Sequence, residues 1–221
     1  MQAHKAFLLE GLGALGLDEN LADPLLHYAD ELLHWNRRIN LTAITDPREV
    51  LVQHVLDSLS VLPYVRSGLL MDVGSGGGLP GLLIALARPD VEVISLESRN
   101  KKVAFQRHAA RVLKLGNFRA EAQRVEAWVQ QPPCAQIISR AFASLSDFVT
   151  LAGMHLAPQG QMLAMKGKAE REEREAVPTP WQVVKMPRLT VPTLDADRHL
   201  VILERGDGAH SGPAGPEEQE A

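Results

Sequence analysis

A glycine-rich loop after an acidic residue is the part of this sequence best suited to bind a ligand. Asp72 ends an apolar run, and Gly74, Gly76 and Gly78 follow at every second position. Glycine has no Cβ and reaches positive φ, so a ligand can lie directly against such a backbone. The apolar stretch from Leu79 onward is typical of a helix, whose first N–H groups point toward the same place. The loop therefore predicts a ligand site at a strand-to-helix turn, against the alternative of a tight turn without a ligand.

A second acid is expected to reach the same ligand. Glu97 ends the next apolar strand, 23 residues after Gly74, where a carboxylate can accept hydrogen bonds from both hydroxyls of an adenosine ribose. A dinucleotide-binding loop would need Gly or Ala where Leu79 stands. The spacing resembles instead the first motif of class I S-adenosylmethionine-dependent methyltransferases. Asp72 would then bind or orient the ammonium group of that cofactor, directly or through water, or it caps the loop amides as a turn acid.

Two further strand ends are expected at the same cleft, because ligands bind at the carboxyl ends of parallel strands. The third strand leads to Val125 and Glu126, where the backbone and the Glu126 carboxylate could read the exocyclic amine of an adenine. Taken alone, Glu126 would be an exposed acid at a helix start. Arg140 follows the fourth strand. An arginine there contacts the ligand or a phosphate, which its position favours, or it is an ion-pair partner.

Apolar runs of strand length alternate with helical patterns after residue 68. This alternation is typical of an α/β fold with a parallel sheet and right-handed helical crossovers. The last two strands have no helix between them, so they should pair antiparallel. The expected strands are 69–73, 91–97, 117–122, 136–140, 160–166, 182–189 and 199–203, and the expected helices are 80–88, 100–115 and 146–156.

The residues before this alternation are expected to be helical. Apolar residues recur at helical spacing in 4–15, 20–38 and 47–62. Asp46-Pro47 predicts the start of the last of these, with an aspartate cap and proline at the first helical position. The charge run 168–175 is expected to be a solvated helix face. The predicted organisation has three parts: a helical extension at 1–65 packed on the core, a cofactor-binding core at 66–205, and a disordered acidic tail at 206–221.

Charge and cysteine content exclude several classes of protein. The net charge is −4, and four acids of the tail leave 23 acids against 23 Lys and Arg in the rest. This is not the bulk charge of a basic nucleic-acid binder, although it allows a local basic face. Cys134 is the only cysteine, so no intrachain disulfide can form, and we interpret it as a structural thiol. Without a signal peptide or a run of the ~20 apolar residues that a membrane span needs, we expect a cytoplasmic protein.

Several segments beyond the glycine loop resemble one family of enzymes. The sequence is similar to ribosomal small-subunit methyltransferase G, the family once called glucose-inhibited division protein B, over most of 20–205. Gly77 stands where that family often has proline, and Glu97 where many relatives have aspartate. The matching segments together are far more diagnostic of this family than the glycine loop alone. They come in the expected order at 35–42, 54–58, 72–81, 138–145, 166–167 and 198–201.

The resemblance implies a fold, a reaction and a set of contacts. The fold is Rossmann-like, with a mostly parallel seven-stranded sheet whose last strand is antiparallel. The reaction is methylation of N7 of one guanine in a conserved loop of 16S ribosomal RNA, with S-adenosylmethionine as cofactor. The partner is 16S RNA or the 30S particle, and we expect a monomer. The family's cofactor contacts match Gly74, Leu79, Val125, Glu126 and Arg140, and we expect substrate contacts at Asn40, His54, Arg140, Lys166 and Arg198.

This substrate atom requires no general base. Guanine N7 carries a lone pair and has no proton to lose, so an in-line displacement depends on positioning, with Arg140 acting on phosphate or cofactor. The sequence accordingly lacks a Ser/His/Asp or Cys/His constellation, and its eight histidines show no metal-ligand spacing. His54 and Asp57 are three positions apart on one helix face, and they either belong to a structural polar network, which we favour, or line the cleft.

Three other functions are compatible with parts of this pattern. A methyltransferase for a small molecule or protein would lack a basic rim and would act without RNA. Leu79 in the third glycine position speaks against a nicotinamide-dependent oxidoreductase. A non-enzymatic nucleotide-binding regulator would keep the cofactor fold and transfer no methyl group.

Overall fold

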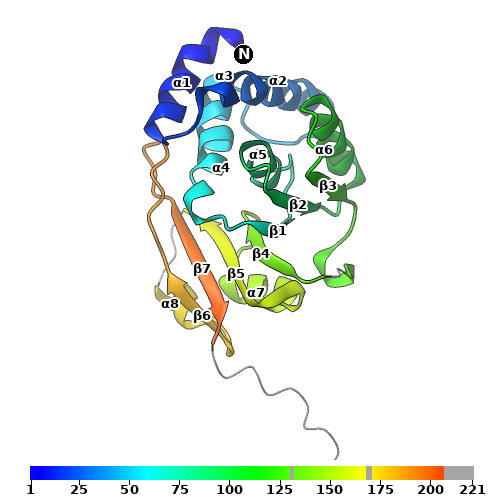
Figure 1. Ribbon diagram of the computed structural model, residues 1–221, viewed down its shortest axis with the longest axis vertical. Coiled ribbons are helices and arrows are strands. Elements are labelled where there is room, and N and C mark those ends of the chain that lie inside the picture. Colours follow the sequence, from blue (N-terminus) through cyan, green and yellow to red (C-terminus); the bar gives the residue numbers. More distant parts are fainter. Residues whose placement is uncertain (130–131, 168–170, 207–221) are drawn as a thin grey trace, which may run out of the picture.

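One seven-stranded sheet divides the protein into two helical layers (Figure 1). The computed structural model describes residues 1–129, 132–167 and 171–206, so the predicted disordered tail lies outside the described residues except for Gly206. Helices α1 to α6 cover one side of the sheet, and α7 and α8 lie on the other. The helices are α1 (Lys5–Ala14), α2 (Ala22–Ile39), α3 (Pro47–Val50), α4 (Asp57–Leu59), α5 (Gly81–Ala87), α6 (Asn100–Val112), α7 (Leu145–Ala152) and α8 (Arg171–Glu175).

The sheet has the predicted mixed topology. Its order is β3-β2-β1-β4-β5-β7-β6, with parallel pairing from β3 through β5. β7 runs antiparallel to both of its neighbours. Strand order reverses between β1 and β4, which is where open α/β sheets bind ligands. The strands are β1 (Gly68–Val73), β2 (Val91–Leu96), β3 (Phe118–Glu121), β4 (Cys134–Ser139), β5 (Leu156–Lys166), β6 (Trp181–Lys185) and β7 (His199–Arg205).

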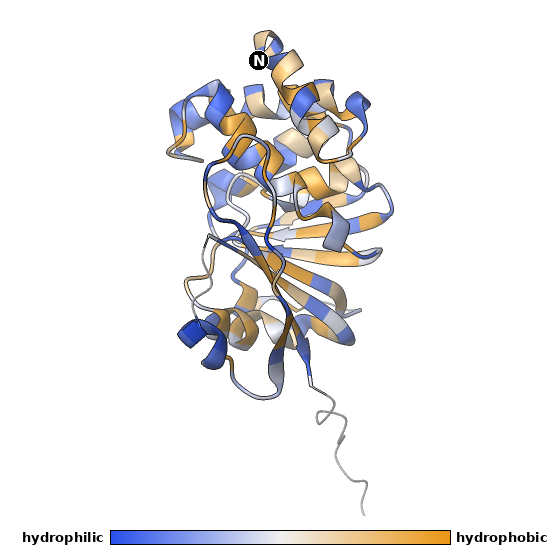
Figure 2. Ribbon diagram, turned by 90° about the vertical axis from the view of Figure 1, so that its left-hand side faces the viewer, coloured by the Kyte–Doolittle hydropathy of each residue, from blue (hydrophilic) through white to orange (hydrophobic). Residues whose placement is uncertain are grey.

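Two hydrophobic cores form because alternate residues of each strand face opposite sides of the sheet. Leu70 of β1 packs with α1, α2, α5 and α6, while its neighbour Met71 packs with α7. The apolar strands accordingly stand between two partly apolar helical layers in Figure 2. Cys134 is fully buried in the second core, where burial raises the pKa of its thiol to about 12. This agrees with a structural thiol.

Several predicted elements were wrong in extent. The single helix expected at 47–62 is divided by a π-helical segment, η3 (Leu51–Leu56), because apolar spacing alone does not detect one extra residue per turn. The strand expected at 182–189 ends at Lys185, and Arg188 forms only an isolated bridge. Pro187 between them has no N–H for a ladder. The strand expected at 160–166 starts earlier, at Leu156, and the helix expected at 146–156 accordingly ends at Ala152.

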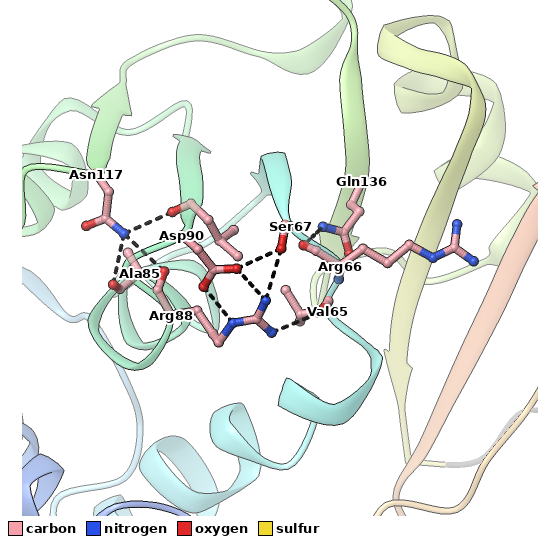
Figure 3. A network of polar contacts seen from close by, with 9 residues as sticks. Val65, Arg66, Ser67, Ala85, Arg88, Asp90, Asn117 and Gln136 are labelled. Carbon is pink, nitrogen blue, oxygen red and sulfur yellow. Dashed lines mark hydrogen bonds and ion pairs between the residues drawn. The ribbon is translucent and has the colours of Figure 1, made fainter.

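Polar contacts tie the segments that precede the strands at the amino edge of the sheet (Figure 3). The Arg88 guanidinium donates to both carboxylate oxygens of Asp90, at 2.8 and 2.7 Å, and to the Val65 carbonyl at 3.0 Å. Hydrogen bonds from Arg88 and then Ser67 hold the pKa of Asp90 far below its usual range. The Asn117 amide donates to three carbonyl groups between α5 and β2. This edge is occupied by structural contacts.

Candidate active site at the carboxyl edge of the sheet

The glycine loop has a backbone that side chains would disturb. Gly74, Gly76 and Gly78 have φ values of 72°, 57° and 83°, in the left-handed region that favours glycine. A Cβ on Gly74 would also lie 2.6 Å from the Cβ of Ala141 in the loop after β4. The two loops therefore approach each other closely at Gly74.

Three elements hold the loop from behind. The Tyr28 hydroxyl of α2 donates to the Gly77 carbonyl at 2.7 Å. The Gln106 amide of α6 donates to Ser75 Oγ at 2.8 Å and to the Gly76 carbonyl at 2.9 Å. The Ser95 hydroxyl of β2 donates to Gln106 Oε1 at 2.7 Å. Neither Tyr28 nor Gln106 was predicted as a site residue, and the only signal was a polar group on the apolar face of a helix.

Tyr28→Phe leaves the buried Gly77 carbonyl without its partner, so the free energy of unfolding should fall by about 1–2 kcal/mol. Cofactor affinity should fall as well, because the loop loses one of its three supports. Urea unfolding and calorimetric titration with S-adenosylhomocysteine measure the two effects.

Tyr64→Phe is the matched control, because the Tyr64 hydroxyl has no hydrogen-bond partner within the described part of the chain. If Tyr28→Phe had the unfolding midpoint and the cofactor affinity of wild type, the hydrogen bond from Tyr28 to Gly77 would contribute neither to stability nor to cofactor binding.

Asp72 is fully buried under the loop. Its Oδ2 accepts from the Gly81 N–H at 2.8 Å, at the start of α5. Its Oδ1 has no partner within the described residues, and burial raises the pKa of the carboxyl to about 7. The geometry supports the turn-acid role, and the contact with the cofactor ammonium stays a prediction.

The predicted adenosine contacts surround one cavity of about 160 Å³. Glu97 is oriented by the Gly76 N–H, 3.1 Å from its Oε2, and by the Arg99 N–H, 2.9 Å from its Oε1. The loop residues Gly74 and Phe142 complete two of its walls. The predicted residues that line this cavity are Gly74, Glu97, Val125 and Glu126.

A second cavity, of about 190 Å³, is also lined by Gly74. Arg140 and Ala141 form one wall, and His54 with Thr42 forms another. A larger cavity of about 260 Å³ lies beside β2 and β3 and contains none of the predicted site residues. The two cavities that share Gly74 therefore form the candidate site. The predicted residues that line the second cavity are His54, Gly74, Gly76, Leu79 and Arg140.

Arg140 is an ion-pair partner, and its contact with a ligand or phosphate stays a prediction. It lines the second cavity, and its Nη1 lies 3.4 Å from Asp57 Oδ2 and 3.3 Å from Ser58 Oγ. Arg198 binds the other oxygen of the same carboxylate, with Nε 3.1 Å from Asp57 Oδ1. The Asp57 side chain is only 3% exposed. This carboxylate therefore joins the end of β4 to the start of β7.

His54 faces Thr42 and does not pair with Asp57. Its Nε2 lies 2.7 Å from Thr42 Oγ1, and its Nδ1 lies 3.1 Å from the Gln53 carbonyl. A carbonyl only accepts, so Nδ1 carries the proton and Nε2 accepts from the threonine hydroxyl. Burial, followed by the charge of Arg140, lowers the pKa of His54 to about 4. The ring is neutral at pH 7. Asn36 positions Thr42 by accepting its N–H at 2.9 Å.

Three predicted substrate contacts lie outside both cavities: Arg198, which binds Asp57, and also Asn40 and Lys166. Asn40 is exposed and ends α2 in the left-handed region, with φ of 49°. The Lys166 ammonium donates to the carbonyls of Phe142 and Ala143, at 3.2 and 2.7 Å, and pairs with Glu173 at 2.7 Å. Within the described residues, no group of three or more His, Cys, Asp or Glu could hold a metal ion. No helix there is long and apolar enough to cross a membrane.

Comparison with known proteins identifies the family. A family model described as rRNA small subunit methyltransferase G matches residues 22–201. The chain belongs to this family. The ribosomal RNA small subunit methyltransferase G of Azoarcus sp. strain BH72 is 48% identical over 90% of this chain and 95% of its own length. The protein of that name in Xanthomonas axonopodis pv. citri strain 306 is 43% identical over 91% of this chain and 95% of its own.

Solved structures agree with the fold. TrmN from Thermus thermophilus matches with a TM-score of 0.55 and 16% identity, over 67% of this chain and 48% of that longer chain. The ribosomal protein L11 methylase of Lactobacillus delbrueckii subsp. bulgaricus matches with a TM-score of 0.54 and 17% identity, over 70% of this chain and 79% of its own. At this identity they show the Rossmann-like methyltransferase fold alone.

Membership of the methyltransferase G family settles the activity. The protein is an S-adenosylmethionine-dependent methyltransferase that acts on N7 of a guanine in 16S ribosomal RNA. Family membership therefore excludes a nicotinamide-dependent oxidoreductase and a non-enzymatic regulator.

Proposed function

We propose that methyl transfer takes place where the two cavities meet at Gly74, with the cofactor's adenosine beside Glu97 in the first cavity and the target guanine in the second. The observation that carries this proposal is that one glycine, Gly74, lines both cavities. The first cavity has only predicted cofactor contacts, whereas the second also has His54, a predicted substrate contact, and Arg140, which was predicted for both roles. A methyl donor and its acceptor have to approach within a few ångströms, which adjoining cavities allow.

The residues present fit S-adenosylmethionine. The Glu97 carboxylate is fixed by two backbone amides and is available to ribose hydroxyls. The Val125 backbone and Glu126 line the far wall, where the adenine amine needs acceptors. Below the loop, Asp72 has a buried oxygen that finds no partner among the described residues, a suitable counter-charge for the cofactor's ammonium group. The cofactor supplies an electrophilic methyl group on a sulfonium.

The side chains around the second cavity position the guanine and take no proton from it. Guanine N7 donates its lone pair, the carbon–sulfur bond breaks toward sulfur, and the methylated ring gains one positive charge. His54 is neutral, and its unprotonated nitrogen, Nε2, already accepts a hydrogen bond from the Thr42 hydroxyl. This agrees with a reaction that needs no base. The Arg140 cation acts on a phosphate or on the cofactor, because a cation against the ring would oppose the charge that forms there.

The substrate is proposed to be a loop guanine of 16S RNA, free or in the 30S particle. The N7 edge is inaccessible in the deep groove of A-form RNA, so an unstacked guanine fits a cavity of this kind. We propose further that the chain acts as a monomer in the cytoplasm. We also propose that residues 1–65 serve as an extension of the core at 66–205, since α2 contacts the glycine loop through Tyr28.

Labelling tests this proposal directly. The protein is incubated with tritiated S-adenosylmethionine and either unmodified 30S particles or deproteinised 16S RNA. We expect label in one guanine. Borohydride and aniline should cleave the RNA there, because these reagents act on N7-methylguanine.

Label at another atom or base would contradict the proposed chemistry. Methyl transfer to a small molecule or protein in the absence of RNA would contradict it as well. Comparison of the 30S and 16S arms decides which form is the substrate.

A further inference from the structure

The loop after β4 forms part of both cavities without regular secondary structure of its own. Arg140 and Ala141 line the second cavity, and Phe142 lines the first. The backbone is extended or bent from Arg140 to Ser144, between β4 and α7. The position of this loop therefore depends on what its backbone groups bind.

The start of the loop is held by β4 itself. Ser139 Oγ accepts from the Ala141 N–H at 3.0 Å and donates to the Val73 carbonyl of β1 at 2.7 Å. The next residues are held from outside. Lys166 Nζ donates to the carbonyls of Phe142 and Ala143, at 3.2 and 2.7 Å. The loop is thus fixed to β1 at one end and to β5 further along.

Glu173 completes this second attachment. Its Oε1 accepts from the Leu145 N–H, at the start of α7, at 3.0 Å, and lies 2.7 Å from Lys166 Nζ. Both side chains are largely covered, with 13% of Lys166 and 21% of Glu173 exposed. Glu173 belongs to α8, in the charge run expected to be only a solvated face, and α8 has no buried residue. One acid of that run is therefore turned inward.

An ammonium group has three N–H donors and no acceptor. Two carbonyls and one carboxylate occupy those of Lys166, so no donor remains for a phosphate of the RNA. The sequence suggested an RNA contact at Lys166, because a basic residue at the carboxyl end of a strand faces the ligand edge. The geometry points to another role.

We propose that Lys166 and Glu173 act as a clasp that positions the loop 140–144, and through it Arg140 and Phe142, for cofactor binding and methyl transfer. They are positioning residues and touch neither reactant. The inference rests on the proposed site, because the loop matters for catalysis only if both cavities are used.

The test compares Glu173→Ala and Lys166→Gln with wild type. Each should raise the KM for S-adenosylmethionine by roughly tenfold, because the loop loses a charge-assisted contact. Calorimetry with S-adenosylhomocysteine should show the same loss without any RNA, and amide hydrogen exchange in 140–150 should accelerate. The KM for S-adenosylmethionine in the double variant should be no higher than in the more damaging single variant, since the two residues act as a unit. Glu173→Gln keeps the acceptor for Leu145 and should recover part of the loss.

Glu172→Ala is the matched control, on the same helix with an exposed side chain; its KM and loop exchange should equal those of wild type. If Lys166→Gln raised only the KM for RNA and weakened its salt dependence, while Glu173→Ala had no effect, the clasp would be wrong and Lys166 would be an RNA contact. Unchanged exchange in 140–150 in both variants would also overturn it. Exchange and cofactor binding are read without RNA, so they stay separate from a failure of the guanine-N7 assignment.

Discussion

Replacing Arg140 by alanine should lower kcat/KM for methyl transfer by about 10²-fold or more and leave the fold intact. Arg140 is the predicted residue that lines the guanine side of the site and also follows the strand at which the sheet order reverses. The fold should survive because Asp57 keeps its second partner, Arg198, at 3.1 Å. Circular dichroism and thermal unfolding establish the fold, and tritium transfer to 30S particles gives the rate.

Two further arginine variants separate catalysis from general electrostatics. Arg140→Lys keeps the charge but loses the planar fork that matches a carboxylate or phosphate, so it should recover only part of the activity. Arg66→Ala is the control, because Arg66 lies at the amino edge and pairs with Glu204 there. It should act like wild type. Normal turnover by Arg140→Ala would remove its assigned role, and an unfolded variant would make the Asp57 pair a structural one.

Arg198→Ala gives a second distinction within the same cluster. Arg198 shares Asp57 with Arg140 but does not line either cavity. Loss of Arg198 should therefore raise the KM for RNA more than the KM for the cofactor, whereas loss of Arg140 should affect both.

The sequence predicted those parts of the site whose chemistry is local. The strand ends at Asp72, Glu97 and Arg140 could be located because apolar runs stop there, and a parallel sheet brings such ends to one edge. The glycines were recognisable because few other residues tolerate positive φ. The mixed sheet with β7 antiparallel followed from the missing helix before it.

The parts that depend on long-range packing could not be predicted. Tyr28 and Gln106 reach the glycine loop from helices 49 and 30 residues away in sequence, and nothing near them marks the contact. The π-helical segment keeps a helical apolar spacing, so the sequence showed a continuous helix. Lys166 was interpreted as an RNA contact because its basic charge was visible, whereas the carbonyl groups that it binds were not.

Replacing Asp72 by asparagine should raise the free energy of unfolding above pH 7 by a few kcal/mol and remove a pH dependence. Burial raises the pKa of Asp72 from 3.8 to about 7 in the folded chain, while the Gly81 amide and Arg140 oppose this and Glu97 adds to it. Between those two pH values only the unfolded chain gives up the proton. The stability of the wild type therefore falls as pH rises, by about 1.4 kcal/mol per pH unit, and levels off above pH 7.

Asparagine keeps the acceptor for the Gly81 N–H and never ionises, so this fall should be absent in the variant. The two proteins should be about equally stable near pH 4 and differ most near pH 8. Urea unfolding at several pH values measures the difference, in which the other titrating groups cancel. A constant difference across this range would show that Asp72 is ionised at every pH tested.

The same substitution should weaken cofactor binding, so that stability and function move in opposite directions. The charges that face Asp72 are those of Arg140 and Glu97, together with the Tyr28 hydroxyl, and the cofactor adds an ammonium group to this set. An added cation favours the ionised carboxyl, so wild-type affinity should rise with pH through about 7, whereas Asp72→Asn should show a flat profile with lower affinity at pH 8.

Titration with S-adenosylhomocysteine, which keeps the ammonium and lacks the sulfonium charge, assigns the effect to the ammonium if the rise of affinity with pH is unchanged. Asp90→Asn, at the opposite edge of the sheet, should keep the wild-type profile. Parallel affinity profiles for wild type and Asp72→Asn would leave Asp72 with its helix-capping role alone.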